Sequence, residues 1–375
     1  MVLAVQWVDE STASPSADGA DGEQPSQELS PRRGGLRLLD QTALPQVECS
    51  LDIRTVDDLV DAIQRLAVRG APALGAAGAL GVVVAMDQAE RAGWSPDELA
   101  AQVDRIRDAR PTAVNLAWGV DRVRPAMAQG RHAVLAQALA LVEEDGAANR
   151  ELSRLGADWL LERTARGRAG EPLRIVTHCN TGALATTAWG TAYGIIHELH
   201  VRGAIELVYA DETRPLLQGA RLTSWELTQD GIPHVVQADG AAASTILRGL
   251  ADAAIIGADR IAANGDTANK VGSVGVALAC ARAGIPFVVA APYSTVDLET
   301  AGGDDIVIEE RSGDEVLVVG GVRVAPEGAR GFNPAFDVTP HDLVSAVVTE
   351  LGIVEPARDP GPRLLARLAP ASDGS

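Results

Sequence analysis

The sequence predicts an α/β protein with a mainly helical N-terminal domain followed by a doubly wound parallel-sheet domain. In the first half, from about residue 36 to residue 170, apolar residues recur at three- and four-residue spacing, which is the period of amphipathic helices. From Leu173 onward, short apolar runs alternate with segments of helical length, which is typical of parallel strands joined by helices. A length of 375 residues is enough for two such domains.

Composition divides the chain into four segments. Residues 1–35 are rich in Ser, Gly, Pro and acidic residues, and they contain too few apolar groups to offset the entropy lost on ordering. We therefore expect a disordered acidic tail there. We expect residues 36–170 to form the helical domain, residues 171–356 the sheet domain, and residues 357–375 a flexible C-terminal tail.

The individual elements follow from the same patterns. Residues 47–55 are an extended segment, and helical periodicity follows in residues 56–68, 97–109 and 133–161. Five apolar runs that end in polar or Gly-rich turns predict the strands of the sheet: residues 173–180, 205–213, 232–240, 251–260 and 285–292. Ligands of such sheets bind outside the carboxyl ends of the strands, so we expect the site among the residues that follow these runs.

Charge and cysteine content argue against several classes of function. A formal net charge of −19 is unfavourable for nucleic acids or acidic membranes, which attract basic surfaces. The three cysteines are far apart and form no CxxC pair, so neither a disulfide framework nor a thiolate zinc site is expected. No apolar run has the ~18 residues that span a bilayer, and the N-terminus lacks the cationic start of a signal peptide. These features predict a cytoplasmic protein.

Two residues after predicted strands are candidates for chemistry. Cys179 follows the first strand, where a helix expected to begin near Gly182 would direct its positive end toward the thiol and favour the thiolate. The alternative is a small buried residue at a crowded turn. Asp259 ends the apolar run AAIIGAD, whose desolvating surroundings favour a neutral carboxyl that can act as an acid. The alternative is a helix cap or an ion pair with Arg260.

Anion-binding groups form a second set of candidates. Lys270 is the only lysine in a chain that otherwise uses arginine, and it ends the loop ANGDTANK, ahead of a Gly-rich helix start. Amides of such a helix start, with Asn269 and Lys270 beside them, predict an anion site. Arg69 and Arg110 each precede a predicted helix as well. The chain contains no HExxH, Walker A, GxSxG or GxGxxG motif, which leaves open a cofactor-free reaction on a small anionic substrate.

Several long blocks of the sequence are more specific than any single motif: LRLLDQTALP, VRGAPALG, RPTAVNLAWG, VTHCNTGALAT, DETRPLLQGARLTSWEL, GADRIAANGDTANKVGS, VVAAPYSTVD, IEER and NPAFDVTP. Together they resemble the methylthioribose-1-phosphate isomerases of methionine salvage. The resemblance runs in collinear order from about residue 36 to residue 355. It implies a Rossmann-like catalytic domain, a homodimer, and isomerisation of 5-methylthioribose 1-phosphate to 5-methylthioribulose 1-phosphate without metal or nucleotide. Tyr293 of APYST, where small residues look more usual, departs from the family pattern.

The resemblance also implies roles for individual residues. Asp259 of GAD is implied as the proton donor and Cys179 of THCN as the second catalytic group. The implied substrate-binding residues are Arg69, Gly70 and Ala71 of VRGA, Arg110 of RPT, Gln218 of LLQG, and Asn269 and Lys270 of ANK. Two alternatives remain: a ribose-1,5-bisphosphate isomerase, and a non-catalytic regulatory subunit that binds a sugar phosphate.

Overall fold

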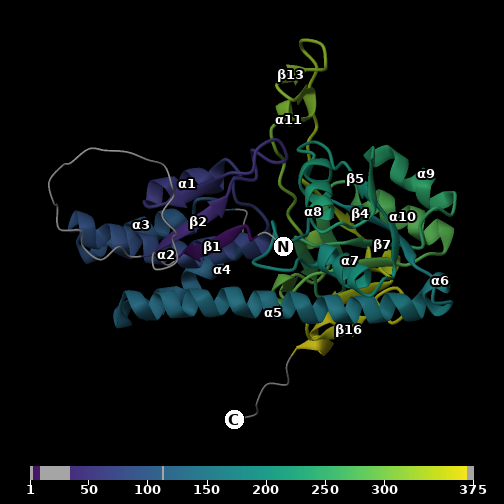
Figure 1. The fold of residues 1–375 in the computed structure, drawn as a ribbon, viewed down its shortest axis with the longest axis horizontal. Helices are drawn as coiled ribbons and strands as arrows, with labels where there is room; N and C mark the ends of the chain where they lie inside the picture. The colour runs from purple at the N-terminus through teal and green to yellow at the C-terminus, as the bar shows by residue number, and fades with distance from the viewer. Residues whose placement is uncertain (1–2, 9–33, 112–113, 370–375) are drawn as a thin grey trace, which may run out of the picture. The chain divides into compact units, whose positions relative to one another are not determined.

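The computed structural model describes residues 3–8, 34–111 and 114–369 (Figure 1). The chain forms two compact units. The helical unit comprises Leu3–Ala43 and Val47–Val142, and the sheet unit comprises Leu44–Gln46, Glu143–Ser375 and the first two residues. The boundary between the units lies within the 33-residue helix α5 (Arg131–Arg163), whereas the sequence placed it near residue 170. The sequence could not reveal this position, because the periodicity of a continuous helix does not change where one unit ends.

The helical unit combines a small antiparallel sheet with helices. Strands β1 (Val5–Val8), β2 (Gly35–Leu39) and β3 (Ser50–Ile53) pair in that order. The helices of this unit are α1 (Val56–Gln64), α2 (Ala71–Ala92), α3 (Pro96–Arg107), α4 (Val114–Val123) and the first part of α5. Capping boxes open two of them: Thr55 caps α1 and bonds reciprocally with Asp58 in its first turn, and Ser95 caps α3 and bonds in the same way with Glu98, which explains where these helices begin.

Small residues bring α2 and α4 close together, as expected from the Gly- and Ala-rich sequence of α2. A Cβ at Gly119 would lie 2.1 Å from the carbonyl oxygen of Gly75, and one at Gly78 would lie 2.9 Å from that of Leu116. Within the described residues, α2 is the one helix long and apolar enough to cross a membrane, and 78% of its apolar window is buried inside the protein. It is therefore the core helix of its unit.

A seven-stranded sheet organises the described part of the sheet unit. The strand order is β16-β15-β10-β7-β4-β5-β6, with parallel pairing throughout except between β15 and β16. The strands are β4 (Leu173–His178), β5 (Ile205–Asp211), β6 (His234–Gln237), β7 (Ala253–Ile256), β10 (Phe287–Ala290), β15 (Ala346–Thr349) and β16 (Gly352–Val354). The five predicted strands are confirmed. The chain winds outward from β4 in one direction and from β7 in the other, so the switch in strand order lies between these two neighbours.

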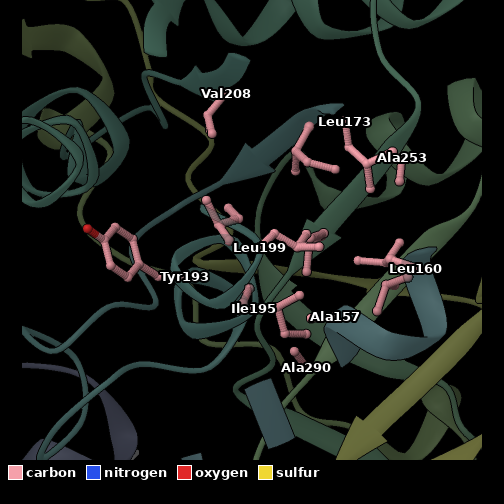
Figure 2. Close-up of a cluster of buried hydrophobic side chains, with 14 of the residues drawn as sticks. Ala157, Leu160, Leu173, Tyr193, Ile195, Leu199, Val208, Ala253 and Ala290 are labelled. Atoms are coloured by element: carbon pink, nitrogen blue, oxygen red, sulfur yellow. The ribbon is translucent and has the colours of Figure 1, made fainter. Parts of the chain in front are cut away.

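Helices cover both faces of this sheet, as the doubly wound prediction requires. The second part of α5 and α7 (Ala192–Val201) contribute to one apolar cluster, in which Leu160, Ile195 and Leu199 lie with the strand residues Leu173 and Val208 (Figure 2). On the other face the cluster includes side chains of α9 (Ala242–Leu247) and α10 (Ser273–Ala283). The remaining helices are α6 (Ala165–Arg168), α8 (Ser224–Gln229) and α11 (Asp314–Leu317).

The segment predicted as the loop ANGDTANK forms a hairpin instead. Strands β8 (Arg260–Ala262) and β9 (Thr267–Lys270) pair antiparallel, and β14 (Phe336–Thr339) pairs with β9 from the other side. Gly265 at φ +98 and the Asn264–Asp266 hydrogen bond of 2.9 Å form the turn between them. Strand β11 (Val296–Asp297) extends this sheet beside β8, and β12 (Val318–Val319) and β13 (Val322–Arg323) pair with each other.

The two predicted tails need correction. Residues 5–8, assigned to the acidic tail, form strand β1 because VQWV is an apolar run that pairs with β2; residues 9–33 lie outside the described residues. At the other end, Leu364–Leu368 forms a 3-10 helix in which Leu364 and Leu365 are buried. Apolar side chains thus tie the described part of each predicted tail to the fold.

Candidate active site

Cys179 lies at the carboxyl end of β4 in a strained backbone conformation. Its φ is +67°, in the left-handed region that a side chain with a Cβ rarely adopts. Its amide donates to the hydroxyl of Thr213 (2.9 Å), and its carbonyl accepts from the hydroxyl of Thr223 (2.7 Å). Cys179 is 8% exposed. Two threonine hydroxyls therefore hold a buried cysteine in a conformation that would otherwise be unfavourable, which is a feature of functional sites.

The helix expected near Gly182 begins only at Ala192. Residues 180–191 form a buried, irregular segment, so the argument that a helix start directly follows Cys179 is wrong. The carboxylate of Glu226 holds this segment, since it accepts from the Asn180 side chain (2.6 Å) and the Leu184 amide (3.1 Å). A Cβ at Gly182 would lie 2.2 Å from that carboxylate, so the close approach requires glycine.

Asp259 follows β7, the strand next to β4. The register pairs His178, the last residue of β4, with Ile256, the last residue of β7. Cys179 and Asp259 therefore follow the ends of two neighbouring strands, at the switch in strand order. Doubly wound sheets bind their ligands at this position. The side chain of Asp259 is exposed, contrary to the desolvated carboxyl that its apolar strand suggested, because the chain emerges from the sheet edge after Gly257.

The hairpin brings Asn269 beside Asp259. The Asp259 amide donates to the carbonyl of Ala268 (2.9 Å), and Arg260 pairs with Ala268, so one further step of the register places Asp259 opposite Asn269. Asn269 is 3% exposed, and its side chain donates to the hydroxyl of Ser273 (2.8 Å). Proximity of Asp259 to the ANK motif therefore comes from strand pairing.

Lys270 is held by its own strand neighbours. Its ammonium group donates to the carbonyl of Ala335 (2.8 Å) and lies 4.2 Å from the ring centroid of Phe336, its cross-strand partner. The aromatic face and the carbonyl suit a compact cation.

The start of α10 does not provide the predicted anion site. The carboxylate of Asp337 accepts from the amides of Gly272 (2.8 Å) and Val274 (3.2 Å), so a protein side chain already occupies this position. Burial raises the pKa of Asp337 despite these two hydrogen bonds. Sequence reasoning missed Asp337 because it lies more than 60 residues away along the chain, on β14.

Gln218 has a buried side-chain oxygen that lacks a hydrogen-bond partner among the described residues. The residue is 6% exposed. It lies directly before the π-helix Gly219–Thr223, and π-helical turns are frequent at functional sites. A buried amide oxygen without a partner is unfavourable unless a ligand or water satisfies it.

The other predicted binding residues lie in the helical unit. Gly70, at φ +94, is the N-cap of α2, so Arg69 precedes this helix and Ala71 begins it. Arg110 lies between α3 and α4. Arg69 and Arg110 therefore precede α2 and α4, as the sequence predicted.

Beside Cys179 lie three side chains of the kinds that bind metal ions: His178, Asp211 and Asp239. One nitrogen or oxygen atom from each lies within 4.8 Å of the others. These side chains already form hydrogen bonds with other groups of the protein. The His178 ring bonds to Asp211 and to the carbonyl of Val271, each at 2.9 Å, and the Asp239 carboxylate accepts from the amides of Thr213 and Arg214, each at 2.7 Å. The three side chains therefore form a hydrogen-bonded network that supports the loop after β4.

Comparison with known proteins agrees with this fold. The model of the initiation factor 2 subunit family matches residues 67–356. A methylthioribose-1-phosphate isomerase from Alkalilimnicola ehrlichii is 49% identical over 337 residues, 88% of this chain and 94% of the relative. A probable bifunctional methylthioribose-1-phosphate isomerase/methylthioribulose-1-phosphate dehydratase from Nocardia farcinica is 54% identical over 336 residues, 89% of this chain. The match spans only 60% of that longer relative.

Two solved structures share the architecture. The 5-methylthioribose 1-phosphate isomerase from Pyrococcus horikoshii has a TM-score of 0.79 at 36% identity, covering 89% of this chain and 93% of that one. The eIF-2B delta subunit from A. fulgidus has a TM-score of 0.77 at 40% identity, covering 86% and 94%. The resemblance to methylthioribose-1-phosphate isomerases is thus confirmed, and this chain belongs to the initiation factor 2 subunit family.

Proposed function

We propose that the chain isomerises 5-methylthioribose 1-phosphate, an aldose, to 5-methylthioribulose 1-phosphate, a ketose, in methionine salvage. The observation that carries the proposal is the placement of Cys179 and Asp259 after neighbouring strands at the switch in strand order. The similarity to isomerases over about nine tenths of the chain supports the substrate class.

The chemistry assigns a task to each residue. A phosphate on the anomeric oxygen prevents spontaneous ring opening, so an acid must protonate the ring oxygen as its bond to C1 breaks. Asp259 is the proposed acid, and exclusion of water by bound substrate would favour its neutral form. The hydrogen on C2 then leaves in one of two ways. It is removed as a proton by a base such as the Cys179 thiolate, which gives an enol phosphate that is reprotonated at C1, or it shifts to C1 as a hydride. In both routes the C2 hydroxyl loses its proton to become the ketone carbonyl.

Substrate binding is the proposed task of Gln218, Asn269 and Lys270 in the sheet unit. The unpartnered oxygen of Gln218 can accept from a sugar hydroxyl, and the charge of Lys270 favours a phosphate. Arg69, Gly70, Ala71 and Arg110 enter the proposal through their match to the family blocks.

The test is an isomerase assay with two sugars at equal concentration. We expect turnover of 5-methylthioribose 1-phosphate, whereas preference for ribose 1,5-bisphosphate would favour the first alternative. Clean, folded protein that turns over neither sugar would favour a regulatory subunit, a possibility that the eIF-2B structures motivate.

Matched variants test the catalytic roles. Asp259→Asn keeps the shape of the side chain but cannot donate a proton, so turnover should fall by ~10²–10⁴-fold with substrate binding retained. Cys179→Ser should also lose turnover, since a hydroxyl does not ionise near neutral pH. The controls are Asp304→Asn, another exposed carboxyl, and Cys280→Ser, another buried cysteine. Equal activity of Asp259→Asn and Asp304→Asn would refute the assignment of the acid.

The proposal extends to assembly and location. We propose a cytoplasmic homodimer, as the family resemblance implies. Light scattering at micromolar concentration should give twice the mass of 38.9 kDa, and a monomer would contradict it.

A further inference from the structure

The side chain of His178 connects two segments that carry proposed active-site residues. The ring is buried, 1% exposed, and both of its nitrogens are bonded. Nδ1 lies 2.9 Å from the carboxylate of Asp211, and Nε2 lies 2.9 Å from the carbonyl oxygen of Val271. His178 directly precedes Cys179, and Val271 directly follows Lys270. One imidazole therefore spans the Cys179 loop and the end of the β8–β9 hairpin.

The hydrogen bonds fix the orientation of the ring. A carbonyl oxygen can only accept, so Nε2 carries a proton that it donates to Val271. On the other side, Asp211 is itself fixed by the side chain of Gln237 (2.9 Å), which in turn accepts from Thr245 (2.7 Å). Rotation of the imidazole would break bonds at both ends in a buried environment, which is costly.

Electrostatics supports the same arrangement. Burial alone would lower the pKa of His178, but the hydrogen bond and charge of Asp211 outweigh it, and the pKa is raised. Burial raises the pKa of Asp211, although its bond to His178 opposes this change. Because the pKa values of both His178 and Asp211 are raised, a proton is retained between the two side chains, and the hydrogen bond between them is kept.

Packing at Gly272 shows how closely the ring approaches the hairpin end. A Cβ at this position would lie 2.8 Å from Cε1 and 3.0 Å from Nε2 of His178. Gly272 has a φ of +112° and donates its amide to Asp337 (2.8 Å). The corner formed by Val271 and Gly272 is therefore in direct contact with the imidazole.

We propose that His178 is a positioning residue that holds Cys179 and the Asn269–Lys270 end of the hairpin at a fixed separation. Asp211 acts through His178 by orienting its ring. The inference rests on the proposed function for the importance of these two groups, but the bridge itself can be measured without turnover.

Two substitutions separate the halves of the bridge. The amide group of asparagine takes the place of Nδ1, so His178→Asn keeps the bond to Asp211 and loses the bond to Val271. The amide group of glutamine takes the place of Nε2, so His178→Gln keeps the bond to Val271 and loses Asp211. His197→Asn and His197→Gln are the matched controls, because His197 is a half-buried histidine on α7 outside the site.

The first readout is hydrogen exchange of the peptide that contains Val271 and Gly272, whose amides donate to Ala335 and Asp337. We expect faster exchange in His178→Asn and near-native exchange in His178→Gln and both His197 variants. Native exchange at this peptide in folded His178→Asn would overturn the inference, whatever the activity of the protein.

The second readout is the division between kcat and KM. A displacement of about 1 Å at a reacting group costs about 10²-fold in rate. Both His178 variants should lose kcat, and only His178→Asn should also raise KM, because it alone frees the hairpin end. Equal losses in the His197 variants would show a general structural effect and overturn the inference. Wild-type protein without isomerase activity would instead refute the proposed function, with the exchange result unaffected.

Asp211→Asn provides a variant for the case in which the His178 variants do not fold. Its amide nitrogen can donate to a neutral Nδ1 while its oxygen still accepts from Gln237, so every bond of the bridge is kept and only the charge is lost. Positioning predicts near-native exchange of the Val271–Gly272 peptide and an unchanged KM. Fast exchange or a raised KM in this variant would contradict the inference.

Discussion

Replacing Thr213 with valine removes the hydroxyl group that links Cys179 to β5. The hydroxyl accepts the Cys179 amide (2.9 Å) and donates to the carbonyl of Asp211 (3.0 Å). Thr213 is fully buried, so water cannot replace it without a rearrangement of the loop. Valine has almost the same shape and leaves the packing intact, so the substitution isolates the two hydrogen bonds.

The magnitude follows from these bonds. A buried amide without an acceptor costs about 1–3 kcal/mol, and loss of the bond to Asp211 adds about 1 kcal/mol. We expect Thr213→Val to lower the free energy of unfolding by about 2–4 kcal/mol. Release of Cys179 from its φ of +67° would also displace the thiol, and a shift of about 1 Å would reduce turnover about 10²-fold.

The assay is urea unfolding of both variants and wild type, with isomerase turnover measured in parallel. Thr339→Val is the matched control, since Thr339 is also fully buried but its hydroxyl has no hydrogen-bond partner in the described part of the chain. Its removal should be neutral or stabilising. A Thr213→Val protein as stable and active as the Thr339→Val protein would refute the argument that the hydroxyl holds Cys179.

Other changes test other parts of the fold. Burial tends to raise the pKa of Asp266, but hydrogen bonds from four neighbouring groups outweigh it and the pKa is lowered. The ionised carboxylate of Asp266 therefore stabilises the fold at pH values above its pKa in the unfolded chain, about 4, and this stabilisation is lost as pH falls through its folded pKa. Wild type and Asp266→Asn should differ in urea midpoint at pH 7 and converge in acid. A constant difference would contradict this. Lys270→Arg exchanges a compact ammonium group for a planar guanidinium group. A lost charged hydrogen bond costs about 1.5–3 kcal/mol, so KM should rise about tenfold or more with kcat retained. An unchanged KM in a substrate titration would mean that the single lysine is incidental. Gly119→Ala places a Cβ 2.1 Å from the carbonyl of Gly75 and should destabilise by about 1–3 kcal/mol in thermal unfolding, whereas Gly275→Ala, with open space at its Cβ, should not. Equal melting temperatures for these two variants would be inconsistent with close packing of α2 and α4.

Local patterns in the sequence were sufficient for most elements. The apolar runs of β4, β5, β6, β7 and β10 predicted strands, and the structure confirms them, although the edge strand β6 exposes Val235 and Val236. Periodicity likewise predicted α1, α3 and α5, because a helix that covers a core repeats its apolar residues every three or four positions. The candidate residues at strand ends were also read directly, since a polar residue after a buried run marks the edge of a sheet.

Long-range pairing explains what the sequence did not reveal. The helix expected after Cys179 is absent because Glu226 and two threonine hydroxyls, all more than 30 residues away, hold that segment in irregular form. The predicted loop before α10 is a hairpin because β14 provides a third strand, and Asp337 of that strand takes the anion position.

The sequence by itself determined the strands β4, β5, β6, β7 and β10, the helices α1, α3 and α5, and the polar groups that follow the strands. It did not determine that β4 and β7 are neighbours, although this pairing is what brings the ends that carry Cys179 and Asp259 together. Local periodicity reports which face of an element is buried, whereas the order of strands depends on hydrogen bonds and side-chain packing between segments far apart in the chain. Those contacts exist only in the folded state, so only the tertiary structure could decide the site.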